Sequence, residues 1–218
     1  MQVTDRKAGQ STDTGLFFRE FIRSPIRTAA VAPSSRFLAE QITVPVAERG
    51  DPVVVELGPG TGAFTKEIQR RLRGRGRHLA IELNPRLADL LGKRYPEVDV
   101  VCGDASTLPD VLAERGLRAD VVVSGLPWVA FPTTAARPLL TLVAQSLAEG
   151  GVFTQFTYGW TRWTTPARRQ LQNLRDTFEE VVVSRTVWRN IPPAVVYLAR
   201  RPRVAGAGGA PREAGPGA

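Results

Sequence analysis

The chain has 218 residues, of which 43% are hydrophobic and 23% charged, and its formal net charge is +8 at pH 7. This composition is typical of one soluble domain with a core of ordinary size, and the length excludes two large domains. A single cysteine excludes an internal disulfide, and no apolar run reaches the ~20 residues that span a bilayer. Because the N-terminus also lacks the layout of a signal peptide, we expect a cytoplasmic protein.

The N-terminal part divides into a polar stretch and two short helical patterns. Residues 1–14 have no hydrophobic period, and we expect them to be disordered. In residues 16–27, phenylalanine and isoleucine share one helical face and arginine recurs every fourth residue on the other. Such a helix suits a membrane interface, or it packs on the core of its own domain. After it, Ser34 or Ser35 is expected to cap a helix that runs to Ile42.

A glycine loop follows the first strand. Residues 53–55 are three valines that predict a strand buried on both faces, and Glu56 ends the run. Gly58, Gly60 and Gly62 then allow turns and close approach of the backbone to a ligand. Apolar residues four apart predict a helix over residues 63–72. A strand, a glycine loop and a helix in this order favour a nucleotide-like cofactor, with a tight structural turn as the alternative.

Two more acids end the next two apolar runs. Glu82 lies twenty residues after Gly62, where a second parallel strand places a carboxylate beside a ribose. Asp104 follows the third run, in Gly103-Asp104-Ala105. A single acid is equally well a solvated strand end, but three acids in order favour one binding edge. The lone His78 is expected at the surface, and Cys102 is expected in the core.

The rest of the chain continues the alternation of strands and helices. Strands are expected at 119–123, 152–158, 180–187 and 194–198, and helices after Pro85, around Val111, from Thr133 or Thr134 to Leu147, and at 166–174. The short linker at 188–193 predicts a hairpin, so the last strand should run antiparallel. From Trp160 onward ten arginines face four acids, and this charge favours a polyanionic partner, either nucleic acid or an anionic membrane surface.

The three acids and the glycine loop together resemble the class I S-adenosylmethionine-dependent methyltransferases. The resemblance implies an α/β Rossmann-like fold, a seven-stranded, mostly parallel sheet with an antiparallel last strand. It also implies S-adenosylmethionine as cofactor, with Glu56 and the glycines near the methionine end, Glu82 on the ribose and Asp104 at the adenine amino group. The positions implied at the cofactor are Ser34, Ser35, Glu56, Gly58, Gly60, Gly62, Glu82, Asp104, Ala105 and Ser124.

The stretch Ser124-Gly125-Leu126-Pro127-Trp128 should lie beside the donor methyl group in that fold. The ribosomal RNA adenine dimethyltransferases and other adenine-amino enzymes carry Asn-Leu-Pro-Tyr or a near relative here. The amide accepts a hydrogen bond from the attacking amino group, and the aromatic ring stacks on the flipped base. Leu126, Pro127 and Trp128 match this motif, whereas Gly125 stands at the asparagine position and supplies no acceptor. The chain also ends soon after the last strand, so we expect no helical RNA-binding domain.

Over about residues 15–201 the fuller pattern resembles the soluble bacterial phospholipid N-methyltransferases. The pieces that carry it are the helix at 17–27, Ala32-Pro33-Ser34-Ser35, the glycine loop, Ser124-Gly125-Leu126-Pro127, and Asn190-Ile191-Pro192-Pro193-Ala194-Val195-Val196-Tyr197. The resemblance implies methylation of the phosphatidylethanolamine amine, toward phosphatidylcholine, by a peripheral membrane protein. It divides the chain into a disordered N-terminus (1–14), N-terminal helices that cover the cofactor site and contact the membrane (15–50), the methyltransferase domain (51–201) and a disordered tail (202–218).

Roles in this reaction follow for a few side chains. Gly125, Leu126 and Pro127 form the loop beside the methyl group, and Tyr158 is a candidate proton acceptor for the amine or only packs against the cofactor. Trp128 and Tyr158 are candidate walls for the methylated cation, with Trp160 as a weaker third. Arg189 is a candidate contact for the lipid phosphate.

Trp160 and Trp163 beside Arg162 suit the headgroup layer of a bilayer, or they close the mouth of a pocket. The alternatives to a lipid acceptor are an adenine of ribosomal RNA or another nucleic acid, a small soluble amine, or no catalysis at all in a lipid- or RNA-binding module.

Overall fold

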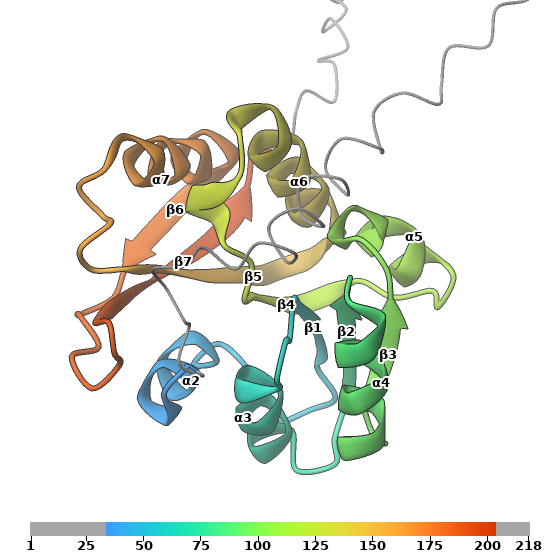
Figure 1. Ribbon diagram of the computed structural model, residues 1–218. Helices are drawn as coiled ribbons and strands as arrows, with labels where there is room; N and C mark the ends of the chain where they lie inside the picture. Colours follow the sequence, from blue (N-terminus) through green and yellow to red (C-terminus); the bar gives the residue numbers. More distant parts are fainter. Residues whose placement is uncertain (1–33, 204–218) are drawn as a thin grey trace, which may run out of the picture.

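The computed structural model describes residues 34–203, so the predicted helix at 16–27, the predicted disorder of 1–14 and most of the predicted tail lie outside the described part. Seven strands form one sheet in the order β3-β2-β1-β4-β5-β7-β6 (Figure 1). The strands are β1 (Val53–Leu57), β2 (Arg77–Glu82), β3 (Asp99–Cys102), β4 (Ala119–Ser124), β5 (Leu147–Tyr158), β6 (Phe178–Val183) and β7 (Ala194–Pro202). Strands β1 to β5 pair in parallel, and β7 runs antiparallel between β5 and β6. The predicted Rossmann-like sheet with an antiparallel last strand is confirmed.

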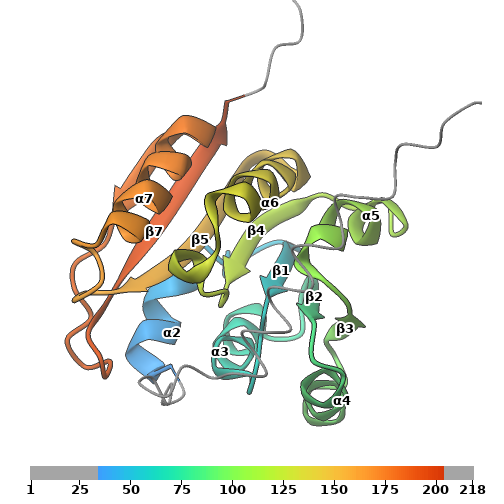
Figure 2. The same cartoon turned by 45° about the horizontal axis from the view of Figure 1, so that its top comes forward.

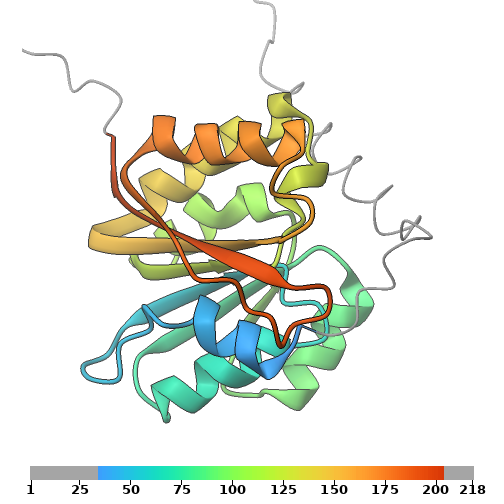
Figure 3. The ribbon, with the colours of Figure 1, turned by 90° about the vertical axis from the view of Figure 1, so that its left-hand side faces the viewer.

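Helices cover both faces of the sheet, as the side view in Figure 3 shows. The helices described are α2 (Arg36–Ile42), α3 (Ala63–Leu72), α4 (Pro85–Arg94), α5 (Leu108–Ala113), α6 (Thr133–Ser146) and α7 (Thr165–Thr177), with short 3-10 turns η1 (Ala105–Thr107) and η2 (Trp128–Ala130). Helices α2, α3 and α4 lie on one face, and α5, α6 and α7 lie in a row along the other (Figure 2). This three-layer arrangement buries both faces of the parallel strands.

The alternation of side chains in β1 shows why the valine run forms a central strand. Val54 packs into the apolar cluster that α2 and α3 cover, whereas Val55 and Leu57 pack into the larger cluster under α5 and α6. Because successive strand residues point to opposite faces, a strand covered on both sides must be apolar throughout. Glu56 is the exception in this strand, and it is fully buried.

The loops that matter for function leave the carboxyl edge of the parallel strands. Backbone hydrogen bonds continue the strand ladder into these loops, from Gly58 N to the Ile81 carbonyl and from Gly125 N to the Leu57 carbonyl. Since β7 is antiparallel, its first residues lie at this same edge, and Ala194 pairs with Tyr158. The carboxyl edge therefore gathers the glycine loop, the loop after β4, the loop after β5 and the β6–β7 connection.

Two residues lie in environments opposite to those expected. His78 is buried rather than exposed, because β2 is an inner strand and the imidazole faces the side chains of Glu56 and Gln69. Cys102 is exposed rather than in the core, because β3 is an edge strand and Cys102 is its last residue. Both predictions were wrong for the same reason: the place of a strand in the sheet depends on topology, which the local sequence does not contain.

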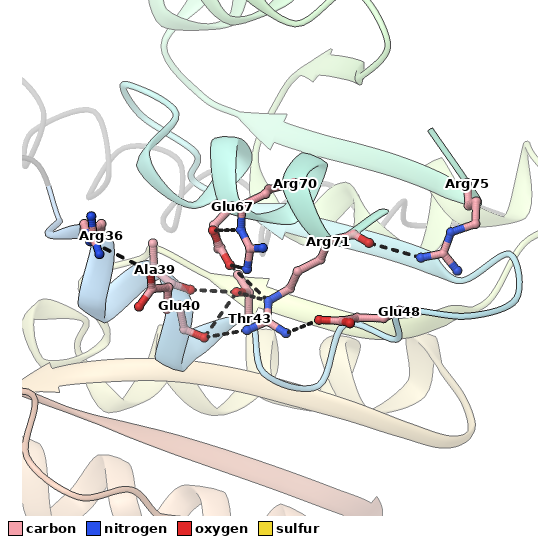
Figure 4. A network of polar contacts seen from close by, with 9 residues as sticks. All are labelled: Arg36, Ala39, Glu40, Thr43, Glu48, Glu67, Arg70, Arg71 and Arg75. Carbon is pink, nitrogen blue, oxygen red and sulfur yellow. Dashed lines mark hydrogen bonds and ion pairs between the residues drawn. The ribbon is translucent and has the colours of Figure 1, made fainter. Parts of the chain in front are cut away.

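A polar network joins α2 to α3 and fixes the helix that leads into the site (Figure 4). Arg71, whose side chain is 13% exposed, donates to Thr43 Oγ1 at 3.0 Å and to the Glu40 carbonyl at 3.2 Å. Its guanidinium also lies 3.2 Å from Glu67 Oε1 and 3.7 Å from Glu48 Oε1. The last turn of α2 is thus held on the surface of α3 by one arginine.

Candidate active site

The glycine loop leaves its backbone open to a ligand. Gly58, Gly60 and Gly62 have φ angles of 67°, 56° and 85°, in the left-handed region that favours glycine. A Cβ added at Gly60 would meet nothing within 4 Å, so this residue faces open space. A Cβ at Gly58 would lie 2.7 Å from Leu126 Cδ2, so the loop packs directly against the loop after β4. The glycines therefore combine a tight turn with an accessible backbone at Gly60.

Glu82 holds the glycine loop in place. Its buried carboxylate accepts from the Gly60 N–H through Oε2 at 3.0 Å and from the Asn84 N–H through Oε1 at 2.9 Å. Each carboxylate oxygen keeps a second lone pair. The acid thus lies at the edge where a ribose is expected, and its role as ribose acceptor stays a prediction.

Glu56 is part of a buried polar cluster beneath the loop. Its Oε2 accepts from Thr65 Oγ1 at 2.7 Å and lies 3.3 Å from His78 Nε2, while Gln69 Nε2 lies 2.9 Å from His78 Nδ1. Oε1 of Glu56 is buried and has no hydrogen-bond partner among the described residues. Leaving a buried acceptor unsatisfied costs about 1–3 kcal/mol, so the unpaired oxygen of Glu56 is an unusual feature of this strand. The implied role of Glu56 near the methionine end of the cofactor stays a prediction.

A narrow pocket follows the ends of β2 and β3. Its lining is mostly apolar, with one carboxylate, and comprises Gly58, Ile81, Leu83, Gly103, Asp104, Ala105, Leu126, Phe131 and Leu139. Asp104 Oδ1 accepts from the Ser106 N–H at 2.8 Å and so caps η1. The pocket volume is about 10 Å³, room for about one water molecule. An adenine ring therefore enters only when apolar side chains of the lining move apart.

The loop after β4 folds back on itself. Ser124 is buried, and its Oγ accepts from Trp128 Nε1 at 2.9 Å and from the Leu126 N–H at 3.3 Å. The Trp128 indole is 2% exposed and packs edge-on against Phe131 and Phe153. Trp128 is predicted to form a wall beside the methylated cation. In this arrangement it does not, because neither face of its ring is accessible. Ser124 Oγ holds the turn of this loop, and its implied place at the cofactor stays a prediction.

Gly125 lies where no side chain fits. A Cβ at this position would lie 2.5 Å from the Gly58 carbonyl oxygen and 3.6 Å from the Leu57 carbonyl oxygen. Both are backbone atoms of the glycine loop and its strand, so they cannot rotate away as a side chain would. An asparagine at 125 would require the glycine loop itself to move.

Tyr158 lies at the end of β5 and packs edge-on against Phe156. Burial raises the pKa of the Tyr158 phenol above its ordinary value. The hydroxyl therefore keeps its proton at neutral pH, and its oxygen can accept a hydrogen bond. This favours packing or hydrogen bonding by Tyr158, and its role as proton acceptor stays a prediction.

The remaining predicted residues lie further along the carboxyl edge. Ser35 caps α2, and its N–H donates to Asn190 Oδ1 at 2.9 Å. The buried Asn190 also donates from Nδ2 to the Pro192 carbonyl at 2.7 Å. The guanidinium of Arg189 lies 4.2 Å above the Phe37 ring, in a groove between α2 and the β6–β7 connection. Asn190 therefore clamps α2 to this connection, a role that its place in a sequence motif did not reveal.

Together the glycine loop, Glu82 and Asp104 fit S-adenosylmethionine, because an open backbone and two strand-end acids lie at one edge of the sheet. The fold and this edge define a class I S-adenosylmethionine-dependent methyltransferase. A family model described as "Methyltransferase domain" matches residues 54–151. The ornithine lipid N-methyltransferase of Singulisphaera acidiphila is 36% identical over 192 residues, 86% of this chain and 96% of that protein. The chain belongs to the methyltransferase family that includes this relative, and its cofactor is S-adenosylmethionine.

Other similarities are shorter or more distant. The ribosomal RNA small subunit methyltransferase A of Chlorobium phaeobacteroides is 31% identical over 97 residues, 44% of this chain and 34% of that protein. Human methyltransferase-like protein 13 in complex with S-adenosylhomocysteine superposes with a TM-score of 0.57 at 15% identity, over 80% of this chain and 82% of that one. Fibrillarin of Aeropyrum pernix with bound S-adenosylmethionine gives 0.54 at 17% identity, over 75% and 72%. These two structures share the fold.

No helix within residues 34–203 is long and apolar enough to cross a membrane.

Proposed function

We propose that this enzyme methylates the primary amine of a membrane-lipid headgroup, with phosphatidylethanolamine as the first acceptor to test. The observation that carries the proposal is the packing at Gly125, where a Cβ would lie 2.5 Å from a backbone oxygen. An adenine amino group is not basic and needs a side-chain acceptor beside it, and no such side chain fits here. An aliphatic amine has its own lone pair once it loses a proton, so it needs positioning more than activation.

The similarity to the Singulisphaera enzyme supports a lipid acceptor independently. It extends over 86% of this chain, whereas the similarity to the Chlorobium ribosomal RNA enzyme extends over 44% of this chain and 34% of that protein. The name of this relative, ornithine lipid N-methyltransferase, supports ornithine lipid as a second candidate acceptor. Both candidate lipids present an aliphatic amine on a membrane surface, so one site chemistry suits them.

In this proposal each part of the carboxyl edge has a defined task. S-adenosylmethionine supplies an electrophilic methyl group. Gly60 and Glu82 orient the donor, while the apolar Leu126 and Pro127 close the space beside it and exclude water. Tyr158 accepts a hydrogen bond from the amine, and Arg189 contacts the lipid phosphate through its guanidinium. The amine gives up its proton to solvent before it attacks in line.

The test is methylation of defined lipids by the purified full-length chain. Liposomes of phosphatidylethanolamine, of ornithine lipid and of phosphatidylcholine alone are incubated with labelled S-adenosylmethionine, and N-methylated products are identified by mass spectrometry. We expect label in the first or second liposome and none in the third, and we expect the Glu82→Ala variant to lose it. Label that appears in ribosomal RNA and in no lipid would refute the proposal.

A further inference from the structure

Three tryptophans and an isoleucine stand exposed on two loops at the carboxyl edge. Trp160 and Trp163 are each 65% exposed, Trp188 is 76% exposed and Ile191 is 81% exposed. We name these four residues the aromatic edge. Large apolar side chains at such exposure are costly in water, and a cluster of them marks an interaction surface. The fourth tryptophan of the chain, Trp128, is buried, so this exposure is specific to the two loops.

The two loops are neighbours in space although about thirty residues separate them in sequence. Residues 159–164 leave β5, and residues 184–193 lead into β7, which pairs with β5 from Tyr158 and Ala194 onward. The Gly159 N–H donates to the Pro193 carbonyl at 2.6 Å, which joins the loops directly. Figure 3 shows both loops at the same edge of the sheet. The two loops that carry the aromatic edge therefore meet at one edge of the sheet, the carboxyl edge that also carries the glycine loop.

Arginines predominate around the aromatic edge. Residues 158–169 and 184–199 contain five arginines and neither Asp nor Glu, namely Arg162, Arg168, Arg169, Arg185 and Arg189. One acid, Glu40 of α2, lines the groove beside Trp188 and Arg189. None of the five arginines forms an ion pair with another described residue, while Arg162 stacks on the Trp163 ring at 4.5 Å. Guanidiniums without an ion-pair partner beside exposed indoles are suited to bind a partner whose interior is apolar and whose surface is anionic.

We propose that the aromatic edge and its arginines dock the enzyme on an anionic bilayer. The indoles and Ile191 enter the headgroup layer, where an amphipathic ring is partly wetted, and the arginines contact lipid phosphates. Single-stranded RNA also binds aromatic and basic surfaces. Ile191 is the most exposed of the four residues and has no ring on which a base could stack, which favours the bilayer.

Docking in this way would turn the active site toward the lipid. The aromatic edge and the glycine loop share the carboxyl edge, so a headgroup amine reaches the donor without leaving the bilayer plane. This consequence rests on the proposed function, whereas the docking surface itself does not.

The test is sedimentation of the full-length chain with vesicles of phosphatidylglycerol and phosphatidylcholine. We expect binding that falls with rising salt, and at least a tenfold lower partition coefficient for a variant with Trp160→Ser, Trp163→Ser, Trp188→Ser and Ile191→Ser. The matched control is Leu90→Ser on α4, because Leu90 is 60% exposed but lies outside the aromatic edge. Binding of S-adenosylhomocysteine should be equal in all three proteins, which shows that they are folded. The residues before Ser34 are present in each, so a loss is assigned to the loops.

Two further measurements keep the proposal falsifiable. Lipids brominated in the upper acyl chain should quench tryptophan fluorescence of the unchanged protein, and the single variants Trp188→Ser and Ile191→Ser should each weaken sedimentation if the fourfold variant does not fold. Vesicle sedimentation of the folded fourfold variant equal to that of the unchanged protein would overturn the proposal. The proposal would also be overturned if the fourfold variant lost its binding to single-stranded RNA and kept its binding to vesicles.

The docking proposal and the proposed function fail in different ways. Methylation of monomeric short-chain phosphatidylethanolamine should be the same in the unchanged protein and in a variant with Trp163→Ser, Trp188→Ser and Ile191→Ser, which leaves Trp160 in place, while methylation in vesicles by that variant should fall at least tenfold. Vesicle binding lost in the variant, with no lipid methylated by either protein, would refute the proposed function and leave the docking surface standing. Methylation in vesicles that the variant retains in full would refute the docking surface alone.

Discussion

At the scale of single residues, the proposed choice of acceptor depends on the close approach of two loops. Gly125 lies against the backbone of Gly58 and Leu57, so the loop after β4 and the glycine loop cannot move independently. Interiors packed at this density transmit small displacements. A change at Gly125 is therefore expected to affect the donor as well as the acceptor.

The variant Gly125→Ala tests this coupling. Its Cβ would meet the Gly58 carbonyl oxygen, and overpacking of this kind costs about 1–3 kcal/mol. We expect S-adenosylhomocysteine affinity to fall about tenfold by calorimetry. The matched control is Gly92→Ala in α4, where a Cβ meets nothing within 4 Å and alanine is the better helix former. A Gly125→Asn variant with unchanged affinity would contradict the coupling.

The protonation of Tyr158 gives a second test at this scale. Because burial raises the pKa of the phenol, Tyr158 stays protonated through neutral pH, and in the proposed reaction the amine loses its proton to solvent. In Tyr158→Phe the rise of kcat/KM with pH should stay at the same pH, and the rate should fall by less than about tenfold. A rise that disappears in this variant would show that Tyr158 is the base after all.

The position of a residue could be predicted from the sequence where the order of the strands determines it, and not where packing against distant residues does. Glu82 and Asp104 follow strand ends, so order along the chain places them at one edge without knowledge of packing. The orientation of Trp128 depends on contacts with Phe131 and Phe153, and the latter lies on another strand. His78 was misplaced because the burial of β2 depends on its neighbours in the sheet.

At the scale of elements, the attachment of α2 to α3 depends on Arg71 and Glu67. The hydrogen bond and charge of Arg70, and then the charge of Arg71, hold the pKa of Glu67 below its ordinary value. A carboxyl with a lowered pKa in the folded state stabilises the fold above its unfolded pKa. This stabilisation is lost as pH falls through the lowered value. The network therefore contributes at neutral pH and fails in acid.

The variant Arg71→Ala tests the network. It removes the donor to Thr43 and to the Glu40 carbonyl and leaves the nearly buried Glu67 with one partner fewer. We expect the free energy of unfolding at neutral pH to fall by roughly 1–3 kcal/mol in urea denaturation. The loss should shrink as the pH is lowered through the Glu67 titration. The control is Arg75→Ala, which removes only hydrogen bonds to two backbone carbonyls. An equal loss of unfolding free energy in Arg71→Ala and Arg75→Ala would contradict this account.

Elements with a strong local pattern were predicted closely, and those fixed by pairing were not. The helix predicted at 63–72 is α3 in the structure, because its apolar period is regular and a glycine precedes it. Strand β5 begins at Leu147, five residues before the predicted start, because Leu147 pairs with Ala119. Gly150 and Gly151 lie within the strand, in an irregular stretch between the pairs Ala119–Leu147 and Val121–Val152.

At the scale of the whole molecule, one edge of the sheet carries both the donor site and the aromatic edge. The parallel strands bring the glycine loop, Glu82 and Asp104 together, and the antiparallel β7 adds the loop with Trp188 and Arg189. The fold could be predicted because strand and helix periods alternate along the chain. The neighbourhood of the loops at 159–164 and 184–193 could not, because only the reversed direction of β7 creates it.

The central claim is that the acceptor is a lipid amine and not a nucleobase. The most direct measurement is a competition in one reaction: the purified full-length chain and labelled S-adenosylmethionine with equal amounts of phosphatidylethanolamine vesicles, ornithine lipid vesicles and small-subunit ribosomal RNA. After separation of lipid from RNA, this account predicts label in the lipid extract as N-methylated headgroup. Label confined to the RNA, with the lipids unmodified, would contradict it.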